Sequence, residues 1–285
     1  MKPILITGGT GQVGTAIQQL SNRFGVEIVA PSRTELDLSS SCRIDERLAQ
    51  RDWGCVINCA AYTAVDKAEQ EADLAFAVNA IAPEMLAKET AARGIRLLHV
   101  STDYVFDGSK DGLYIESDPV APLGIYGQSK LAGEQAIGVG NVDHVILRTA
   151  WVVSPWGNNF VKTMLRVGAE RKQLRVVDDQ RGCPTSAIDI AQALLTIATK
   201  GGPIGIYHFV NSGEASWCEL ARFIFERAGM DVEVEAITTE QYPTPARRPA
   251  NSRLATDRIG RNYGITPRPW QAAIGEVVDA LRGNK

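Results

Sequence analysis

Residues 3–14 read PILITGGTGQVG, a short apolar run followed directly by Gly8, Gly11 and Gly14. The apolar run predicts a buried strand over residues 3–7, and residues 13–24 have the pattern of a helix. Glycines at such a turn allow a tight bend, close approach of a phosphate to the backbone, and close packing of helix on strand. The start of the helix also presents unpaired N–H groups. The stretch therefore predicts a binding site for the diphosphate of a dinucleotide.

The rest of the first half repeats this strand-then-helix pattern. Its apolar runs are nearly continuous, as expected for parallel strands that are buried on both faces. Repeated units of this spacing predict an α/β fold with a doubly wound parallel sheet of the Rossmann type. The further predicted strands are residues 26–30, 55–60, 95–101 and 144–149, and the further helices are 40–50, 72–93 and 128–138.

The second half has a looser pattern, because loops rich in Pro and Gly separate its helices. We expect residues 1–150 to form a dinucleotide-binding domain and residues 151–285 a smaller substrate-binding lobe, with some later segments returning to the first domain. The predicted helices of this half are residues 158–171, 187–199, 216–228 and 271–282.

Composition limits the possible partners and compartments. The formal net charge of −3 argues against a nucleic acid or an anionic membrane as partner, and no stretch is apolar and long enough to span a membrane. The short apolar start does not resemble a signal peptide. Five scattered cysteines without a C-x-x-C pair indicate free thiols and a cytoplasmic protein. His99, His144 and His208 lie in separate apolar runs, so we expect histidines within strands and no metal site.

The end of the second predicted strand bears on the choice of cofactor. It runs into Pro31, Ser32 and Arg33, with no carboxylate at the tip to bind a ribose 2′-hydroxyl. Arg33 and Ser32 can instead bind a 2′-phosphate. This favours NADPH, while NADH remains possible and a solvated loop arginine is the alternative interpretation.

The sequence YGQSK, residues 126–130, places Tyr126 and Lys130 one turn apart on the same face of a helix. Reduction of a ketone needs a proton donor, and the usual pKa of tyrosine is near 10. We expect the Lys130 ammonium to lower the pKa of Tyr126. Ser101 and Thr102, at the end of the preceding strand, offer hydroxyls that can polarise a carbonyl, or alternatively close a turn.

Seven motifs follow one another in order and cover most of the chain: GGTGQVG, CAAYTAVDKAE, STDYVFDG, YGQSKLAGE, LRTAWV, GNNF and YPTPARRPANSRL. This ordered set resembles the dTDP-4-dehydrorhamnose reductase family of the extended short-chain dehydrogenase/reductase superfamily. The resemblance implies NADPH-dependent reduction of the C4 ketone of dTDP-4-dehydro-L-rhamnose to dTDP-L-rhamnose, for cell-surface polysaccharides such as lipopolysaccharide.

The resemblance also implies roles for single residues. Thr102 polarises the ketone, Tyr126 donates the proton, and Lys130 assists Tyr126 and binds the cofactor. The other implied contacts are Gly11, Gln12 and Val13 for the cofactor diphosphate, Asp37 and Leu38 around the adenine, Ala60, Ala61 and Tyr62 for the ribose and nicotinamide, Asp103, Tyr104 and Trp151 for the sugar, and Arg247 and Arg248 for the substrate diphosphate.

One departure from the family concerns metal and assembly. Some members are dimers held partly by Mg²⁺ on glutamates, whereas this chain has Ala16, Ile188 and Ala280 at the matching positions. We therefore expect no metal, and either a monomer or a homodimer. Other functions remain open: another sugar-nucleotide reductase, an epimerase or dehydratase of the same fold, and a non-catalytic nucleotide-binding regulatory subunit.

Overall fold

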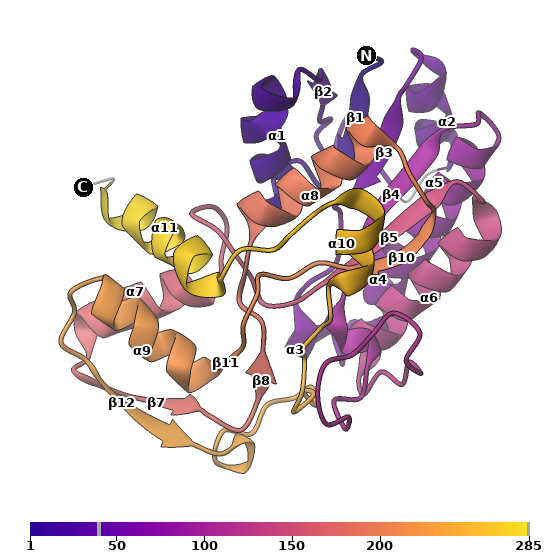
Figure 1. Ribbon diagram of the computed structural model, residues 1–285. Helices are drawn as coiled ribbons and strands as arrows, with labels where there is room; N and C mark the ends of the chain where they lie inside the picture. The colour runs from indigo at the N-terminus through magenta and orange to yellow at the C-terminus, as the bar shows by residue number, and fades with distance from the viewer. Residues whose placement is uncertain (39–40, 284–285) are drawn as a thin grey trace.

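The computed structural model describes residues 1–38 and 41–283. Its centre is a parallel sheet in the strand order β10-β5-β4-β3-β1-β2 (Figure 1). The doubly wound α/β fold predicted from the sequence is thus confirmed. The strands are β1 (Ile4–Thr7), β2 (Ile28–Val29), β3 (Cys55–Asn58), β4 (Arg96–Thr102), β5 (His144–Thr149) and β10 (Gly205–His208).

The sheet has a topological switch point between β1 and β3, because the chain first adds β2 on one side of β1 and then β3 on the other. Thr7, the last residue of β1, lies opposite Asn58, the last residue of β3. Ligands of open α/β sheets bind outside the carboxyl ends of the strands at such a point. The loops that follow Thr7 and Asn58 are therefore the expected place for a bound ligand.

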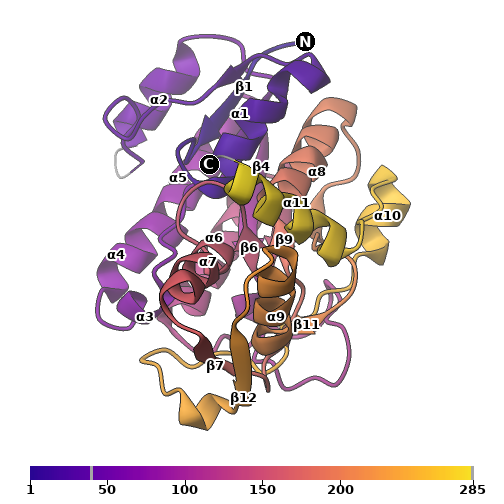
Figure 2. The ribbon, with the colours of Figure 1, turned by 90° about the vertical axis from the view of Figure 1, so that its left-hand side faces the viewer.

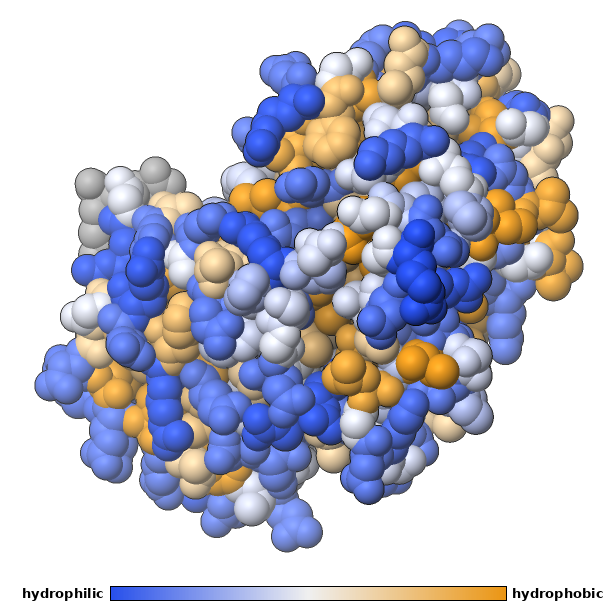
Figure 3. Space-filling model, viewed as in Figure 1, coloured by the Kyte–Doolittle hydropathy of each residue, from blue (hydrophilic) through white to orange (hydrophobic). Residues whose placement is uncertain are grey.

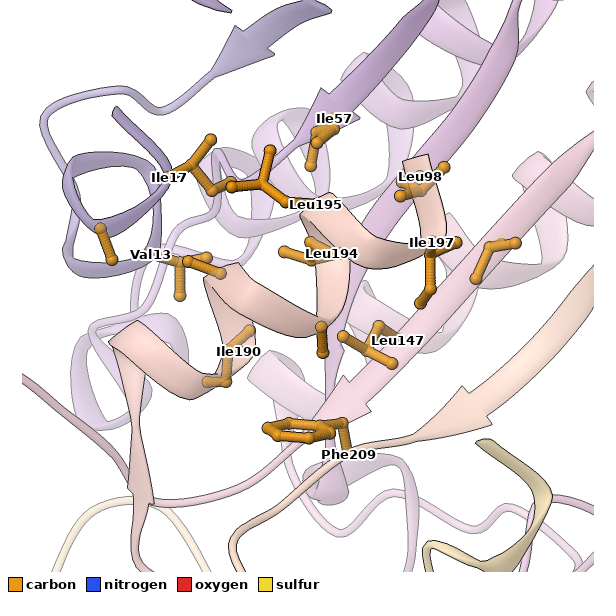
Figure 4. Close-up of a cluster of buried hydrophobic side chains, with 14 of the residues drawn as sticks. Val13, Ile17, Ile57, Leu98, Leu147, Ile190, Leu194, Leu195, Ile197 and Phe209 are labelled. Atoms are coloured by element: carbon orange, nitrogen blue, oxygen red, sulfur yellow. The ribbon is translucent and has the colours of Figure 1, made fainter. Parts of the chain in front are cut away.

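Helices cover both faces of the sheet. On one face α1 (Gln12–Phe24) packs beside α8 (Ala187–Lys200), and Figure 4 shows Ile17, Leu194 and Leu195 pointing toward one another above the sheet. On the other face lie α2 (Ser41–Ala49), α5 (Ala82–Ala91) and α6 (Ile125–Gly140). This two-sided burial explains why the sheet strands lack alternation of polar and apolar residues.

The lower lobe in Figures 1 and 2 comes from the second half of the chain. There β7 (Gln173–Val177) pairs in parallel with β12 (Glu233–Ile237), beside α7 (Phe160–Glu170), α9 (Trp217–Arg227) and α11 (Trp270–Gly283). Two buried clusters hold this lobe together, one around Leu220 and Ile274 and the other around Phe225. Its helices begin and end within a few residues of the predicted bounds.

Some elements differ from the prediction. The single helix expected over residues 72–93 is interrupted, since α4 (Ala72–Phe76) continues into a π-helical turn, η1 (Ala77–Ile81), before α5. Strand β10 contains His208, as expected for a histidine within a strand, but its place in the main sheet, from beyond residue 150, was not predicted. The remaining elements are α3 (Val65–Ala68), η2 (Asp103–Val105), β6 (Val152–Val153), β8 (Arg181–Gly182), β9 (Thr185–Ser186), β11 (Ala215–Ser216), η3 (Thr239–Gln241) and α10 (Asp257–Tyr263).

The face shown in Figure 3 is mainly hydrophilic, with apolar residues in small, scattered groups. Within residues 1–38 and 41–283, none of the helices is long and apolar enough to cross a membrane. All five cysteines are free thiols, and burial raises the pKa of Cys55 and of Cys59 to about 12.

Candidate active site

The glycine-rich loop lies at the switch point of the sheet. Gly8 has φ +68°, and a Cβ on it would come within 2.6 Å of the Ala60 nitrogen. A Cβ on Gly14 would come within 2.3 Å of the Gly8 carbonyl oxygen, so this glycine allows α1 to pack on the loop. The Gly11 N–H donates to the Gly8 oxygen at 3.0 Å and closes the turn. Both close approaches demand glycine, as expected where a backbone must receive a diphosphate.

The first turn of α1 is open to an anion. Its N-cap is Gly11, which supplies no side-chain cap to the N–H groups. Val13 is buried, and the Gln12 side chain is fixed by the second half of the chain. Its Oε1 accepts hydrogen bonds from Ser154 at 2.9 Å and from Asn159 at 3.0 Å. The loop thus meets the second half of the chain through Gln12, a contact that the sequence did not predict.

The tip of β2 presents Ser32 and Arg33, both exposed. A residue missed by the sequence analysis, Glu35, also lies here, because its carboxylate accepts the Ser32 N–H at 2.7 Å. Hydrogen bonds from Ser32 hold the pKa of the Glu35 carboxyl below its usual value. Asp37 is exposed and Leu38 is half-buried. A cationic and an anionic side chain therefore occur together where the cofactor ribose is expected.

The segment after β3 is held by a second residue that was missed, Asn79. Asn79 lies in the π-helical turn, accepts the Tyr62 N–H at 2.8 Å and donates to the Tyr62 oxygen at 3.0 Å. It also donates to Ser129 of α6 at 3.0 Å. π-Helical turns are frequent at functional sites. Asn79 connects the half-buried segment of Ala60, Ala61 and Tyr62 to the helix that carries Tyr126 and Lys130.

Thr102 and Tyr126 meet at the carboxyl end of β4. The Thr102 hydroxyl accepts the Tyr104 N–H at 3.2 Å and donates to Asp103 Oδ1 at 2.9 Å. A hydrogen bond with Thr102 lowers the pKa of Tyr126, but burial outweighs it and raises that pKa to about 12. The Tyr104 and Tyr126 rings contact edge to face, with centroids 5.4 Å apart. The geometry places a phenol, a hydroxyl and a carboxyl within one small site.

Lys130 is buried behind this group and does not act on Tyr126 as expected. Its Nζ donates to the Val100 oxygen at 2.7 Å and lies 3.1 Å from Nε2 of His99. Burial lowers the pKa of Lys130 to about 8. The expectation that Lys130 lowers the pKa of Tyr126 is wrong for this arrangement, because the amine is directed into β4 and burial dominates the tyrosine.

Asp103 is also buried, and this raises its pKa to about 6 in spite of hydrogen bonds from Ser252 and Thr102. A carboxyl of this kind changes charge near neutral pH. Because Thr102 has one hydroxyl proton, donation to Asp103 competes with donation to any other acceptor. The charge of Asp103 therefore influences where the Thr102 proton points.

Arg248 lines a cavity of about 350 Å³ in the second half of the chain, and Trp151 is connected to it through Trp217, which also lines the cavity. Trp151 has φ +48°, a strained conformation for a tryptophan, and stacks on Trp217 at 3.5 Å. Arg248 lines the cavity and pairs with Asp66 at 2.8 Å, whereas Arg247 is exposed outside it. Most lining residues were not identified from the sequence: Phe160, Thr163, Met164, Arg175, Val176, Val177, Gln180, Trp217, Tyr242 and Thr244.

The side chains at Ala16, Ile188 and Ala280 carry no atoms that could bind a metal. Ala16 is buried within the core, Ile188 is half-buried against it, and Ala280 is exposed. Nowhere in the described ranges do three or more His, Cys, Asp or Glu side chains gather in a way that could hold a metal.

Comparison with known proteins identifies the family. The model described as "RmlD substrate binding domain" matches residues 1–282. The dTDP-4-dehydrorhamnose reductase of Sinorhizobium fredii is 43% identical, over 98% of this chain and 97% of that protein. Two solved structures of such reductases are similar. The one from Clostridium acetobutylicum has a TM-score of 0.94 and 40% identity, covering 98% and 99% of the two chains. The one from Bacillus anthracis, in complex with NADP, has a TM-score of 0.93 and 35% identity, covering 100% and 99%.

The family model and the curated relatives agree over nearly the whole length of the chain. The chain belongs to the dTDP-4-dehydrorhamnose reductase family.

Proposed function

We propose that this protein reduces the C4 ketone of dTDP-4-dehydro-L-rhamnose to the hydroxyl of dTDP-L-rhamnose, with NADPH as reductant. The grouping of Thr102 and Tyr126 beside the glycine-rich loop carries the proposal. Family membership supports it, and so does the NADP found in the Bacillus anthracis relative.

The residues around the loop suit a dinucleotide. The close approaches at Gly8 and Gly14 and the uncapped start of α1 form a cradle for its diphosphate. Gly11, Gln12 and Val13 line this cradle, and Ala60, Ala61 and Tyr62 border the ribose and nicotinamide. Ser32 and Arg33 bind the 2′-phosphate, with Asp37 and Leu38 near the adenine. NADH is the weaker alternative because it lacks the 2′-phosphate that Ser32 and Arg33 bind. The Glu35 carboxylate beside Ser32 moderates this preference for NADPH.

NADPH, when bound, supplies a hydride for the carbonyl carbon. The chain's own residues then control the proton. Tyr126 donates its phenolic proton to the carbonyl oxygen, which becomes the C4 hydroxyl. Thr102 donates a hydrogen bond to the same oxygen and stabilises its developing charge. Lys130 binds the cofactor ribose.

We place the substrate between this group and the cavity that Arg248 lines. Asp103 and Tyr104 contact the sugar, and Trp151 packs against its apolar side. Phe160, Trp217 and Tyr242 offer aromatic faces to the thymine base. Arg248 and Arg175 supply cations for the diphosphate, and Arg248 is preferred over the exposed Arg247.

The two parts of the chain bind different ligands in this proposal. Residues 1–150 bind NADPH and residues 151–285 bind the sugar nucleotide, although β10 and α8 of the second part complete the sheet and its cover. The five free thiols support a cytoplasmic location. We assign no resident metal, no nucleic-acid partner and no membrane partner, and the assembly is a monomer or a homodimer.

One assay tests the proposal. The absorbance of NADPH is followed with dTDP-4-keto-6-deoxyglucose that a 3,5-epimerase has equilibrated, and the product is compared with dTDP-L-rhamnose. Oxidation that depends on both the epimerase and this protein is expected. Conversion of a dTDP-sugar without net oxidation of NADPH would indicate an epimerase or dehydratase instead, and binding without turnover would indicate a non-catalytic subunit.

A further inference from the structure

Four buried polar side chains form a continuous line behind the active site. Thr7, Asn58 and His99 lie opposite one another on β1, β3 and β4, and Lys130 reaches them from α6. Thr7 Oγ1 donates to Asn58 Oδ1 at 2.6 Å, and Asn58 Nδ2 lies 3.0 Å from His99 Nδ1. His99 Nε2 lies 3.1 Å from Lys130 Nζ. The line therefore ends at the amine proposed to bind the cofactor.

The direction of each hydrogen bond in this line is fixed. Asn58 Oδ1 accepts the Ala60 N–H at 3.1 Å as well as the Thr7 hydroxyl, so the amide cannot be turned over. Asn58 Nδ2 must then donate to His99 Nδ1. Burial, the main cause, holds the pKa of His99 well below its usual value, so the ring is neutral. A neutral ring that accepts at Nδ1 carries its proton on Nε2.

The contact between His99 and Lys130 therefore depends on the charge of the lysine. An ammonium has three N–H donors and no lone pair, so it cannot accept the Nε2–H. An uncharged amine can accept it while it still donates to the Val100 oxygen at 2.7 Å. The arrangement of side chains in this structure fits the uncharged amine.

Other charged groups around Lys130 oppose this preference only partly. Glu134, one turn further along α6, favours the ammonium, but it already accepts from Arg148 at 2.6 Å and from Ser101 at 2.5 Å. Cys59, which follows β3, is a neutral thiol because burial raises its pKa to about 12. Burial of Lys130 itself acts in the same direction as His99, and the pKa of Lys130 is about 8.

We propose that His99 is a positioning residue whose Nε2–H, oriented by Asn58, favours the uncharged amine of Lys130 over the ammonium that NADPH recruits. This inference rests on the proposed contact of Lys130 with the cofactor. Its consequence is that NADPH binding takes up a proton at Lys130, and that the orientation of His99 sets how much. The Ala60 N–H donates to Asn58 of this line, and Ala60 also borders the proposed cofactor site.

The test reverses the direction of the hydrogen bond between residue 58 and His99. In Asn58→Asp a carboxylate replaces the amide donor, so the ring proton moves to Nδ1 and Nε2 becomes an acceptor for the ammonium. His99→Gln can likewise turn its amide oxygen toward Lys130. Proton uptake on NADPH binding is measured by calorimetry near pH 8 in buffers of different ionisation enthalpy, and the dissociation constant of NADPH is measured against pH.

We expect wild type to take up a fraction of a proton. Both variants should take up less, and their loss of NADPH affinity at high pH should begin about one pH unit higher. Lys130→Met should abolish the uptake. His208→Gln, the same change at another buried strand histidine, is the matched control and should leave the uptake and the pH profile unchanged.

Unaltered uptake and an unshifted pH profile in both Asn58→Asp and His99→Gln would overturn the inference, whatever their effect on turnover. Uptake that persists in Lys130→Met would also overturn it, because the proton would then belong to another group. These measurements need no sugar nucleotide. A failure of the proposed reduction would appear separately, as intact NADPH binding without turnover.

Discussion

Arg248 donates hydrogen bonds to both carboxylate oxygens of Asp66, at 3.2 and 2.8 Å, and so ties the proline-rich loop of the second half to α3 of the first. The hydrogen bonds from Arg248 and from the Ala246 N–H hold the pKa of Asp66 below its usual value. An arginine fixed in this way beside the cavity is already oriented to receive an anion.

Arg248→Ala should therefore raise KM for the dTDP-sugar about tenfold to a hundredfold, because a charged hydrogen bond contributes about 1.5–3 kcal/mol. The KM for NADPH should stay close to that of wild type. Arg247→Ala, at the exposed neighbour, is the matched control. Steady-state kinetics with each substrate varied in turn would measure this, and equal effects of the two substitutions would remove Arg248 from the diphosphate site.

Tyr126→Phe should lower kcat by about 10²–10⁴-fold, since the reaction loses its proton donor. The phenolic oxygen contributes little to dinucleotide affinity, so the dissociation constant of NADPH should remain close to normal. Single-turnover kinetics and a fluorescence titration with NADPH test the two halves of this prediction. A variant with more than half of the wild-type kcat would exclude Tyr126 as the acid.

Asp103 predicts a pH dependence of stability. Its folded-state pKa of about 6 lies above the ordinary value of 3.8, so the folded protein binds this proton more tightly than the unfolded chain. The resulting stabilisation is complete below pH 3.8 and is lost as pH rises through 6. Relative to Asp103→Asn, wild type should lose about 2 kcal/mol of unfolding free energy between pH 4 and pH 8. Urea unfolding of both proteins at the two pH values would measure it, and a constant difference would contradict it.

The tip of β2 predicts cofactor choice. Arg33→Ala should raise KM for NADPH about tenfold to a hundredfold and leave KM for NADH nearly unchanged, because only NADPH carries the 2′-phosphate. Glu35→Gln should have the opposite effect and improve the use of NADPH, since it removes the negative charge beside Ser32. Parallel kinetics with both cofactors decide this, and equal changes for the two would refute the assignment.

Metal removal should have no effect. The missing carboxylates at Ala16, Ile188 and Ala280 leave Mg²⁺ without its preferred ligands there. Activity and assembly state should therefore be the same with EDTA and with added Mg²⁺, as measured by kinetics and light scattering. A loss of activity that Mg²⁺ restores would show that other carboxylates, such as Glu276 or Asp279, form a site.

The sequence predicted what depends on local spacing. The glycine-rich turn, the buried strands and the Y-x-x-x-K helix were found because each requires particular residues within one or two turns of chain. It did not predict Asn79, the partners of Gln12, or the stacking of Trp151 on Trp217, since these contacts join segments far apart in the sequence. The pattern placed Lys130 on the correct face of its helix but could not show that the amine is directed toward His99.

Strand β10 lies far along the chain from β5, the strand with which it pairs, and this separation affects folding during translation. A ribosome making this chain completes β5 at Thr149, but the strand that covers its outer edge, Gly205–His208, is translated more than fifty residues later. Until then the nascent chain presents the bare edge of a parallel sheet, which is a template for pairing with other chains. The two halves are assigned different ligands, but the first half cannot complete its sheet without β10 from the second half. A gene fragment that stops at residue 150 should yield aggregates, and one that continues through residue 208 should close the edge.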